Sequence, residues 1–230
     1  SQQEPRLVVH YAALYKLPSV YDVVDAYNND ANSDFHQTVA DMAEIPRSQA
    51  KTINLGLFYG MGKAKLQAEL GVSKDKAAEL FNTYHGKVPF VKQLMEKASN
   101  RAQDRGQIRT LLGRLCRFHL WELYYRYICI KMSHEDALQE HGPGIKRAYT
   151  YKSLNKLIQG SAADMTKKSM LELYKEGIVA HIQIHDELCL SIENDAQAKK
   201  IVEIMEQAVT LEVPNKVDYE HGINWGSIND

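Results

Sequence analysis

The sequence contains little cysteine and no pattern that would use it. Only three cysteines occur among 230 residues, at positions 116, 129 and 189, and no two of them form a CxxC pair. Neither a disulfide framework nor a zinc site built on paired cysteines is indicated. We expect all three to be small buried residues kept in a reducing compartment.

Long apolar runs are also missing. No stretch approaches the roughly 18 consecutive apolar residues needed to cross a bilayer, and no signal peptide precedes the first polar segment. We therefore expect no membrane partner. The chain opens with Ser-Gln-Gln-Glu-Pro and has no initiating Met, so we expect it to be part of a longer protein.

An excess of charge of one sign is absent as well. Lys and Arg number 28 and Asp and Glu number 29, which gives a formal net charge of −1. A globally basic surface for nucleic acid is thereby excluded, and any such surface must be local. With 44% hydrophobic and 25% charged residues, the composition is typical of a globular protein long enough to bury a full core.

Helical patterns account for most of the chain, and strand patterns are few. We expect helices over residues 1–14, 46–60, 63–70, 74–84, 90–104, 151–176 and 194–210. Ser1 and Glu4 fit a capping box for the first of them. Residues 108–112 predict a short extended piece, and residues 178–192 alternate between apolar and polar as a strand does. Residues 18–33 indicate turns, and residues 121–144 allow no assignment. This mixture with few strands predicts an α+β fold.

The helix expected over residues 46–60 carries an unusual row of side chains. Arg47, Lys51, Leu55 and Tyr59 recur every four residues and therefore share one face. Two cations near the start of a helix are electrostatically misplaced, because that end is already partly positive. An anion such as a triphosphate would explain them, although an ordinary surface helix can also carry an Arg and a Lys by chance.

A second candidate site lies in the alternating segment, where His185, Asp186 and Glu187 are adjacent. Asp186 falls in phase with the apolar positions, where a charge is costly unless it is paired or bound to metal. A hairpin turning here would present both carboxylates at its tip. Mg²⁺ typically binds through one or two carboxylates plus substrate phosphates. A polar turn without any metal is the alternative interpretation, since Asp is common in turns.

The helix expected over residues 151–176 carries a third pattern. Asn155 and Gln159 share a face, and the four residues after Gln159 are Gly, Ser, Ala and Ala. Amide side chains both donate and accept hydrogen bonds, which suits contacts in the DNA minor groove. The small residues permit close approach of another element. A tightly packed core helix with two solvated amides would give the same pattern.

Taken together and in this order, the motifs resemble those of the family A DNA polymerases, the family of bacterial DNA polymerase I and many phage replicases. Residues 47–60 resemble the fingers helix, residues 158–164 the palm helix, and residues 184–188 the second carboxylate motif. Residues 1–6 resemble the tail of the first carboxylate motif, which reads Asp-Tyr-Ser-Gln-x-Glu-x-Arg. Three shorter matches are Asp34-Phe-His36, Thr110-Leu-Leu-Gly113-Arg114 and Gly222-Ile-Asn-Trp225.

This resemblance implies a polymerase palm with a small antiparallel sheet and an inserted helical fingers subdomain. Residues 1–33 and 107–230 would form the palm, the latter with a connecting segment, and residues 34–106 the fingers. The implied activity is DNA-directed DNA synthesis in replication, in which a deoxynucleotide is transferred to a primer 3′-hydroxyl with two Mg²⁺ ions. Primer–template DNA and deoxynucleoside triphosphates (dNTPs) are the implied partners, in the cytoplasm of a bacterium or a phage-infected host.

The resemblance also assigns the nucleotide-binding residues. Arg47 and Lys51 would hold the phosphates, with His36 assisting. Tyr59 would pack beside the templating base, and Glu4 would be the steric gate against a ribose 2′-hydroxyl.

The remaining assignments concern DNA, metal and catalysis. Asn155 and Gln159 would contact the duplex minor groove, and His185 the primer end. Asp186 would be the metal ligand, with Glu187 supporting it. Asp186, Glu187 and Lys51 are thus the catalytic candidates.

Three departures from the family pattern have consequences. The first-motif Asp would lie just before Ser1, so we expect this chain to be inactive as it stands. Leu55 stands in the nucleotide site where the family has Phe or Tyr, and leucine cannot stack as a ring does; this favours a phage-type member. Tyr151 stands where we would align an arginine that contacts the duplex.

Two other functions are compatible with parts of the pattern. One is a catalytically inactive fragment that binds nucleic acid or nucleotides. The other is a relative of the single-subunit RNA polymerases, which share a similar fingers helix. Glu4 argues against the second, because a carboxylate beside the sugar suits deoxynucleotides. The sequence names no processivity factor and no oligomeric state.

Overall fold

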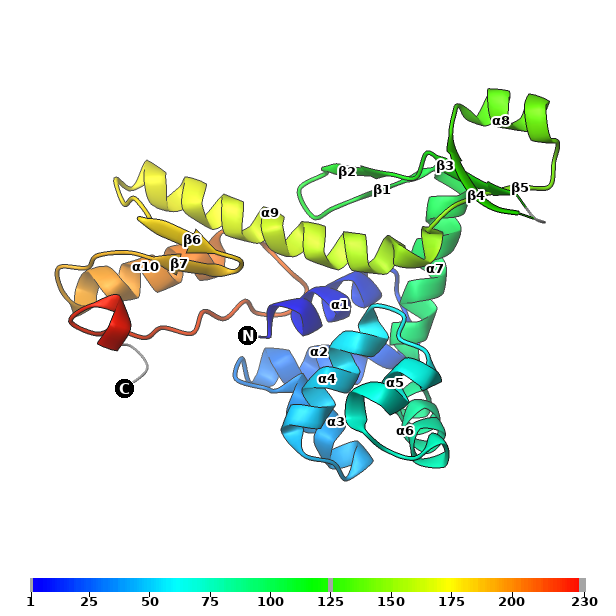
Figure 1. The fold of residues 1–230 in the computed structure, drawn as a ribbon. Helices are drawn as coiled ribbons and strands as arrows, with labels where there is room; N and C mark the ends of the chain where they lie inside the picture. Colours follow the sequence, from blue (N-terminus) through cyan, green and yellow to red (C-terminus); the bar gives the residue numbers. More distant parts are fainter. Residues whose placement is uncertain (1, 124–125, 228–230) are drawn as a thin grey trace.

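A computed structural model describes residues 2–123 and 126–227, and the regular elements that it describes up to residue 106 are all helices. Figure 1 shows these helices gathered below and beside one long helix, α9. In chain order they are α1 (Gln3–Leu14), the 3-10 turn η1 (Pro18–Val20), α2 (Tyr21–Asn29), α3 (Phe35–Ala43), α4 (Arg47–Phe58), α5 (Lys63–Leu70), α6 (Lys74–Lys87) and α7 (Pro89–Arg105).

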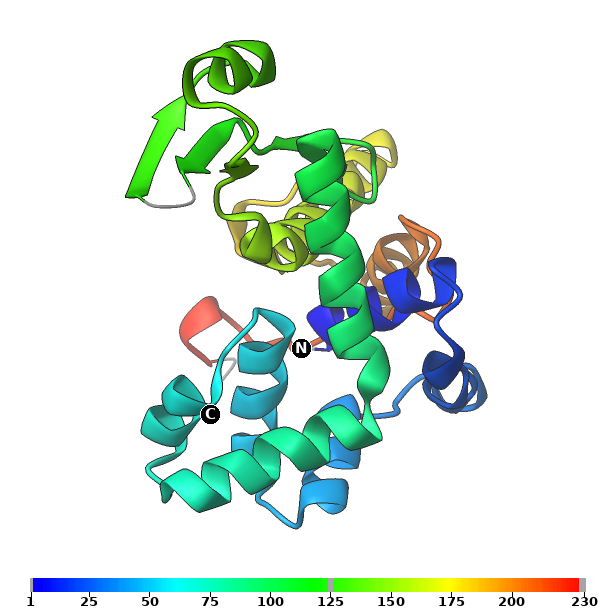
Figure 2. The same cartoon turned by 90° about the vertical axis from the view of Figure 1, so that its right-hand side faces the viewer.

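Helix α7 connects the lower helical group to the upper part of the molecule (Figure 2). It begins with Pro89 in its first turn, where a missing N–H costs nothing, and it ends at Gly106 in the left-handed conformation with φ of +65°. Phe90, Val91 and Leu94 are all 0% exposed on its inner face. Because α7 packs on α1, α4, α6 and α9, it holds the two parts in one body.

Among the described residues after α7, the strands form three small antiparallel sheets. Strands β1 (Gln107–Arg109) and β2 (Leu115–Arg117) form a hairpin, and β3 (Leu120–Leu123), β4 (Arg126–Lys131) and β5 (Ile145–Arg147) form a sheet in the order β4-β3-β5. Helix α8 (His134–His141) lies between β4 and β5 in the chain. The segment for which the sequence allowed no assignment is therefore a separate small lobe, at the upper right of Figure 1.

The last part of the chain is built around α9 (Ser153–Lys175), which is preceded by the 3-10 turn η2 (Thr150–Lys152). After Gly177 the chain returns as a hairpin of β6 (Ile182–Ile184) and β7 (Glu187–Cys189). Helix α10 (Asp195–Gln207) then packs on α9, and a short turn η3 (Trp225–Ser227) ends the described chain.

The core is centred on α1, which is apolar on almost every side. Leu7, Val8, Val9 and Ala12 are each 0% exposed, because α1 lies among α2, α4, α7 and α9. A helix that is hydrophobic all round is stable only when it is enclosed in this way. The core thus fixes the start of α1, and with it Glu4, against the helices that carry the other candidate residues.

Most expected elements are confirmed, but the interpretation of residues 18–33 is wrong. Residues 18–33, expected to be turns, contain the nine-residue helix α2. Val23, Val24 and Tyr27 of this helix pack on the core at helical spacing, although only Tyr27 is fully buried. Residues 178–192 form the two short strands of the expected hairpin. The cap of α1 is Gln2, which makes no side-chain capping bond. The expected cap, Ser1, lies outside the described residues.

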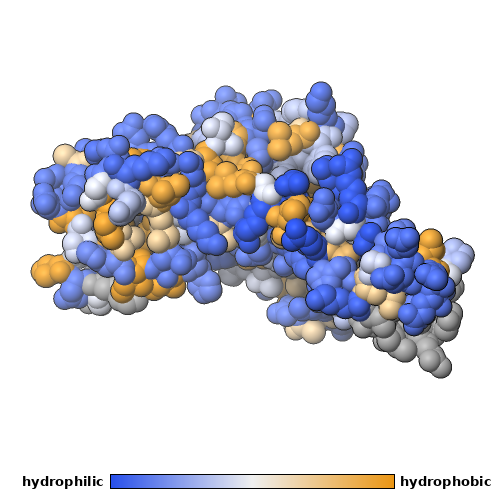
Figure 3. Space-filling view, turned by 90° about the horizontal axis from the view of Figure 1, so that it is seen from above, coloured by the Kyte–Doolittle hydropathy of each residue, from blue (hydrophilic) through white to orange (hydrophobic). Residues whose placement is uncertain are grey.

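The surface is mixed in polarity, as the balanced composition implies. Seen from above in Figure 3, apolar residues gather at the end of the molecule that holds the C-terminal half of α9, β6, β7 and α10. Exposed apolar residues of this region include Met170, Leu171, Val179 and Ile182. Within residues 2–123 and 126–227, no helix has the length and apolarity needed to span a membrane. Cys116 and Cys189 are free thiols and only partly buried; the side chain of Cys129 lies outside the described set.

Candidate nucleotide and nucleic-acid site

Helix α4 presents its row of four residues much as the spacing predicts. Its opposite face is buried through Ile53, Leu57 and Phe58, each at most 1% exposed. Lys51 is exposed, the Arg47 side chain is 50% exposed, and Leu55 and Tyr59 are half-buried. The helix starts directly after Pro46 and ends at Tyr59, after which Gly60 reverses the chain with φ of +80°.

An anion does lie beside Arg47, and it comes from the chain itself. The Asp34 carboxylate Oδ2 accepts a hydrogen bond from Arg47 Nε at 2.6 Å and lies 2.5 Å from Nη2. Its other oxygen, Oδ1, caps α3 by accepting from the backbone N–H groups of His36 and Gln37, and also accepts from Gln2 Nε2 at 2.7 Å. Partial burial opposes ionisation of Asp34, but the Arg47 and backbone hydrogen bonds outweigh it and lower the pKa of the carboxyl.

His36 lies in the interior rather than at the surface. Its side chain is 1% exposed, and its Nδ1 is 2.9 Å from the side-chain Nδ2 of Asn54, which is itself fully buried. Desolvation, reinforced by the nearby charges of Arg47 and Lys51, lowers the pKa of His36 to about 4. The predicted contact of His36 with phosphates is therefore not available in this arrangement, because the ring does not reach solvent.

Three elements meet at the far end of the α4 row. Gln159 Nε2 of α9 donates to the Tyr59 hydroxyl at 2.5 Å and lies 3.5 Å from Glu4 Oε1 of α1. Burial and the neighbouring Glu4 charge raise the pKa of Tyr59 to about 12, so the phenol stays protonated. Residues from positions 4, 59 and 159 thus form one polar cluster, although the sequence separates two of them by 155 positions.

An open groove of about 520 Å³ lies next to this cluster, between the end of α4 and the start of α9. Leu55 and Tyr59 line one side and Asn155 the other, together with Tyr151 and Lys152 of η2. Tyr151 is 59% exposed. The complete lining set is Leu55, Gly56, Tyr59, Gly60, Met61, Gly62, Lys65, Tyr151, Lys152 and Asn155. The groove therefore offers aromatic rings, an amide and two lysines together.

The small residues after Gln159 allow the β1–β2 turn to approach α9 closely, as the sequence predicts. A Cβ added to Gly160 would lie 2.6 Å from Thr110 Cγ2. Ser161 Oγ accepts from the Leu111 N–H and is 2.7 Å from the Tyr11 hydroxyl.

An ion pair secures the same contact, and sequence reasoning did not find it. Arg114 Nε donates to the buried Asp164 at 3.0 Å, and its Nη2 donates to the Gly160 carbonyl at 2.7 Å. Both residues belong to motifs quoted above, but only the fold brings them together. The ion pair holds the turn of α9 that presents Gln159.

The acidic turn forms at the tip of the β6–β7 hairpin. Ile184 pairs with Glu187, so His185 and Asp186 are the two turn residues, and His185 takes a left-handed φ of +52°. All three polar residues of the turn are exposed. Glu187 is the first residue of β7 and accepts a weak hydrogen bond from Cys189 Sγ at 3.6 Å. The expected hairpin is confirmed, with Asp186 at its tip.

The structure does not bring every candidate into one cavity. The groove is lined by residues of α4, α5, η2, α9 and the α4–α5 connection, and the acidic turn is not among its lining residues. Within the described part of the chain, no group of three or more His, Cys, Asp or Glu side chains is arranged to hold a metal ion. Asp186 therefore lies in the exposed turn with only Glu187 as a neighbouring carboxylate in that turn.

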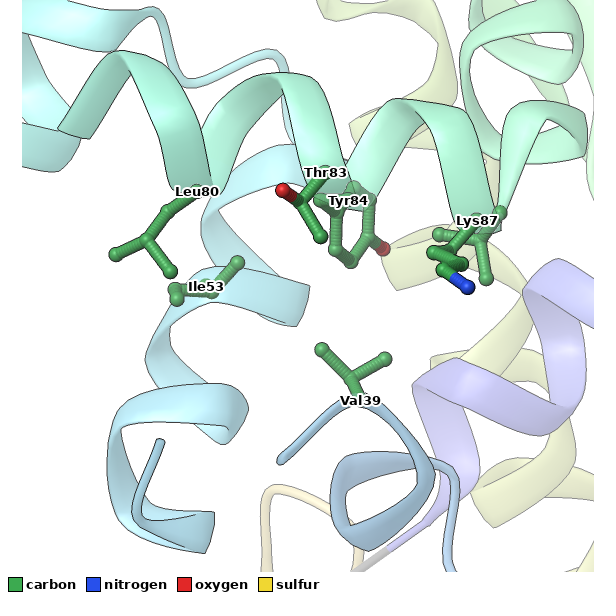
Figure 4. A pocket seen from close by; sticks show the side chains of 7 residues that line it. Val39, Ile53, Leu80, Thr83, Tyr84 and Lys87 are labelled. Atoms are coloured by element: carbon green, nitrogen blue, oxygen red, sulfur yellow. The ribbon is translucent and has the colours of Figure 1, made fainter. Parts of the chain in front are cut away.

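A second cavity is part of the core and not a site. It holds only about 10 Å³ between α3, α4 and α6, where Ile53 and Leu80 face each other and Tyr84 lies beside them (Figure 4). The Tyr84 hydroxyl is buried there without a hydrogen-bond partner, and burial raises its pKa well above the usual value. A gap of this size and apolar lining is at the limit for one water molecule.

Comparison with known proteins gives one consistent result. The sequence model of DNA polymerase family A matches residues 1–227. A DNA-directed DNA polymerase of Pseudomonas phage M6 is 36% identical, and the match covers 98% of this chain and 37% of that protein. DNA polymerase I of Geobacillus stearothermophilus is 33% identical over 98% of this chain and 25% of its own length.

A solved structure gives the same relationship at the level of the fold. The POL domain of Pol1 from M. smegmatis, in complex with DNA primer-template and dNTP, superposes with a TM-score of 0.75 at 25% identity and covers all of this chain and 39% of that one. The chain thus spans between a quarter and two fifths of the length of these three relatives. The match to the family model extends over nearly every residue, so the chain belongs to DNA polymerase family A.

Proposed function

We propose that this chain forms the nucleotide- and DNA-binding part of a DNA-templated DNA polymerase. The observation that carries the proposal is the convergence of Glu4, Tyr59 and Gln159 beside an open groove that also contains Asn155. These residues come from three separate helical segments. Packing of the helices against one another would not by itself require a solvent-accessible cluster of a carboxylate, a phenol and an amide.

The incoming dNTP would bind along the α4 row. Arg47 and Lys51 would attract its phosphates, because both cations lie on the exposed face near the start of the helix. Tyr59 would pack beside the templating base, and Leu55 would give apolar contact without ring stacking. Glu4 would exclude a ribose 2′-hydroxyl. His36 would take part only if α3 and α4 moved apart, since its ring is enclosed here.

The primer–template would lie over the opposite side of the groove. Asn155 and Gln159 are placed on adjacent turns of α9, where their amides can contact acceptors in the minor groove. His185 would contact the primer end. Tyr151 and Lys152 line the groove and would contact a DNA strand by stacking and by charge, respectively.

Magnesium is the metal that the carboxylates of the hairpin would suit. Asp186 offers hard oxygen donors in an exposed turn, and one or two carboxylates plus substrate phosphates are a typical Mg²⁺ environment. When bound, two such ions activate the attacking hydroxyl and stabilise the leaving pyrophosphate. Glu187, the next residue, would support Asp186, and Lys51 would neutralise charge on the phosphates.

The subdomains follow from the same resemblance. Residues 34–106 would be the fingers and residues 1–33 and 107–230 the palm, with α7 between them. The relatives are polymerases of bacteria and their phages, which supports a role in DNA replication in the cytoplasm.

Primer extension by a longer protein, in which the Asp and Tyr of the first motif precede Ser1, tests the proposal. With Mg²⁺, a primed template and labelled primer, we expect extension with deoxynucleotides and not with ribonucleotides. Asp186→Ala should lose nearly all activity, because the metal would lose a protein ligand. Asp195→Ala removes an equally acidic residue from the start of α10 and should extend primers normally.

Two results would contradict the proposal. Normal extension by Asp186→Ala would remove the carboxylate from the mechanism. If the longer protein binds primed DNA without extending it under any of these conditions, the chain serves as a nucleic-acid-binding unit.

A further inference from the structure

The start of α4 carries two cations, and only one of them has an anionic partner. Arg47 is paired with Asp34 through Oδ2, whereas Lys51, one turn further, has no ion-pair partner within residues 2–123 and 126–227. The two oxygens of Asp34 have separate tasks. Oδ1 caps α3 and accepts from Gln2 of α1, and Oδ2 alone contacts Arg47.

We propose that Asp34 is a positioning residue which occupies Arg47 in place of a nucleotide phosphate and must release it when a triphosphate binds. The proposal rests on the proposed function, since it assumes that Arg47 receives a phosphate. It assigns to the Asp34 carboxylate a role that capping alone does not need, because capping uses only Oδ1.

Geometry and charge both support this competition. The guanidinium donates through Nε and Nη2 to one carboxylate oxygen, so its Nε–Nη2 edge, one of the two edges that can form a fork with a phosphate, is already engaged. The pKa of Asp34 is lowered, despite partial burial, by the hydrogen bonds from Arg47 and the α3 backbone, so the carboxylate is charged at neutral pH. A phosphate and a carboxylate cannot both occupy that edge.

The pair also connects three elements that form the site. Gln2 and Glu4 belong to the start of α1, Asp34 caps α3, and Arg47 begins α4. When Asp34 holds Arg47, it keeps α4 close to α3 and to the start of α1. Release of Arg47 would free α4 from one of these connections at the moment when a triphosphate arrives.

Asp34→Asn separates the two tasks of the carboxylate. Asparagine keeps one oxygen to cap α3 and to accept from Gln2, and it is as good a cap as aspartate. It replaces Oδ2 by an NH₂ group, which cannot accept from Arg47. Asp41→Asn is the matched control, because it removes the same charge from α3 at a side chain that bonds to Gln37 and not to Arg47.

Isothermal titration of the 230-residue chain with dATP, and separately with inorganic triphosphate, measures the effect. Half of the Arg47 side chain is exposed, so the pair is weak, and Asp34→Asn should tighten both ligands by about two- to five-fold. Asp41→Asn should leave both affinities within error of the wild type. In an Arg47→Gln background, Asp34→Asn should have no effect, because the competing cation is gone.

The outcomes distinguish this proposal from the function on which it rests. If the wild type binds either ligand and Asp34→Asn binds it equally or more weakly, the competition is refuted while the nucleotide site stands. If Asp34→Asn tightens binding equally with and without Arg47, the effect is general electrostatics and the proposal fails. If no variant binds either ligand, the nucleotide site itself fails. If Asp34→Asn does not fold, Asp34→Ser takes its place in every comparison, because serine keeps an oxygen that caps α3 and carries no charge.

Discussion

Removal of Arg114 should destabilise the molecule and loosen the helix turn that carries Gln159. The Asp164 carboxylate is 5% exposed and is held by Arg114 Nε and Nη2 at 3.0 Å and by the Leu112 N–H at 3.3 Å. In Arg114→Met the apolar stem is kept, but Asp164, in a nearly water-free position, loses the only ion-pair partner that it has among the described residues. The bond from Arg114 to the Gly160 carbonyl is lost as well.

The size of the effect follows from the burial of the two partners. Breaking a fully buried pair by removing one partner costs about 3–5 kcal/mol. Here the Arg114 side chain is 47% exposed, so water can partly replace it and we expect a loss of about 2–3 kcal/mol. For a chain of this size, that corresponds to a fall of roughly 4–12 °C in the unfolding midpoint.

Thermal unfolding followed by circular dichroism provides the measurement. Arg109→Met is the matched control: Arg109 lies on the same hairpin, is exposed, and donates only to the Gly113 carbonyl. Arg114→Met with Asp164→Asn should recover part of the loss, because the unpaired charge is removed. A midpoint for Arg114→Met within about 1 °C of Arg109→Met would refute the reasoning, since it would mean that the buried carboxylate needs no cation.

Two further predictions concern packing and pH. Gly160→Ala should lower the free energy of unfolding by up to about 2 kcal/mol in denaturant titrations, because the cost of placing the new Cβ 2.6 Å from Thr110 Cγ2 exceeds the roughly 1 kcal/mol that alanine gains over glycine in a helix. Adding Thr110→Ser removes that methyl group and should restore the lost stability. A Gly160→Ala single variant that is more stable than the wild type would contradict the close contact. His36, with its pKa lowered to about 4, binds fewer protons in the folded than in the unfolded state between about pH 4 and 6.5. The contribution of the neutral His36 ring to the free energy of unfolding is therefore complete above about pH 6.5, and up to about 3 kcal/mol of it is lost as the pH falls to 4. In His36→Asn, the free energy of unfolding should fall less steeply with decreasing pH over this range. An unchanged slope would argue against a buried neutral ring.

Local patterns in the sequence were sufficient to predict most helices. Asn194 caps α10 and Gly106 ends α7 as the sequence indicates, because caps act within a few residues. Helix α2 was missed although Val23, Val24 and Tyr27 lie at helical spacing, because the Asn and Asp residues at its end are typical of turns. The three-stranded lobe was not predicted for a different reason. Strand β3 pairs with β5, although a helix lies between them in the chain, and such pairing cannot be recognised from local sequence patterns.

The candidate site shows the same division between local and distant relationships. The Arg47–Tyr59 row and the acidic hairpin turn could be predicted, because each depends on one helical or strand period. The contact of Gln159 with Tyr59 and Glu4 could not, since it depends on how three helices pack. The Asp34–Arg47 pair was also missed. The sequence argument asked for an anion at the start of α4, and the clue was the motif Asp34-Phe-His36, whose Asp lies 13 residues before Arg47.

Helix α9 sets a fixed spacing inside this molecule. Its 23 residues extend for roughly 35 Å, with Asn155 and Gln159 near one end and the chain leading to the Asp186 turn at the other. Gain or loss of a single residue within it would rotate everything downstream by about 100°. We therefore expect length changes among relatives to fall in surface loops and peripheral lobes, and the number of residues in α9 to stay constant.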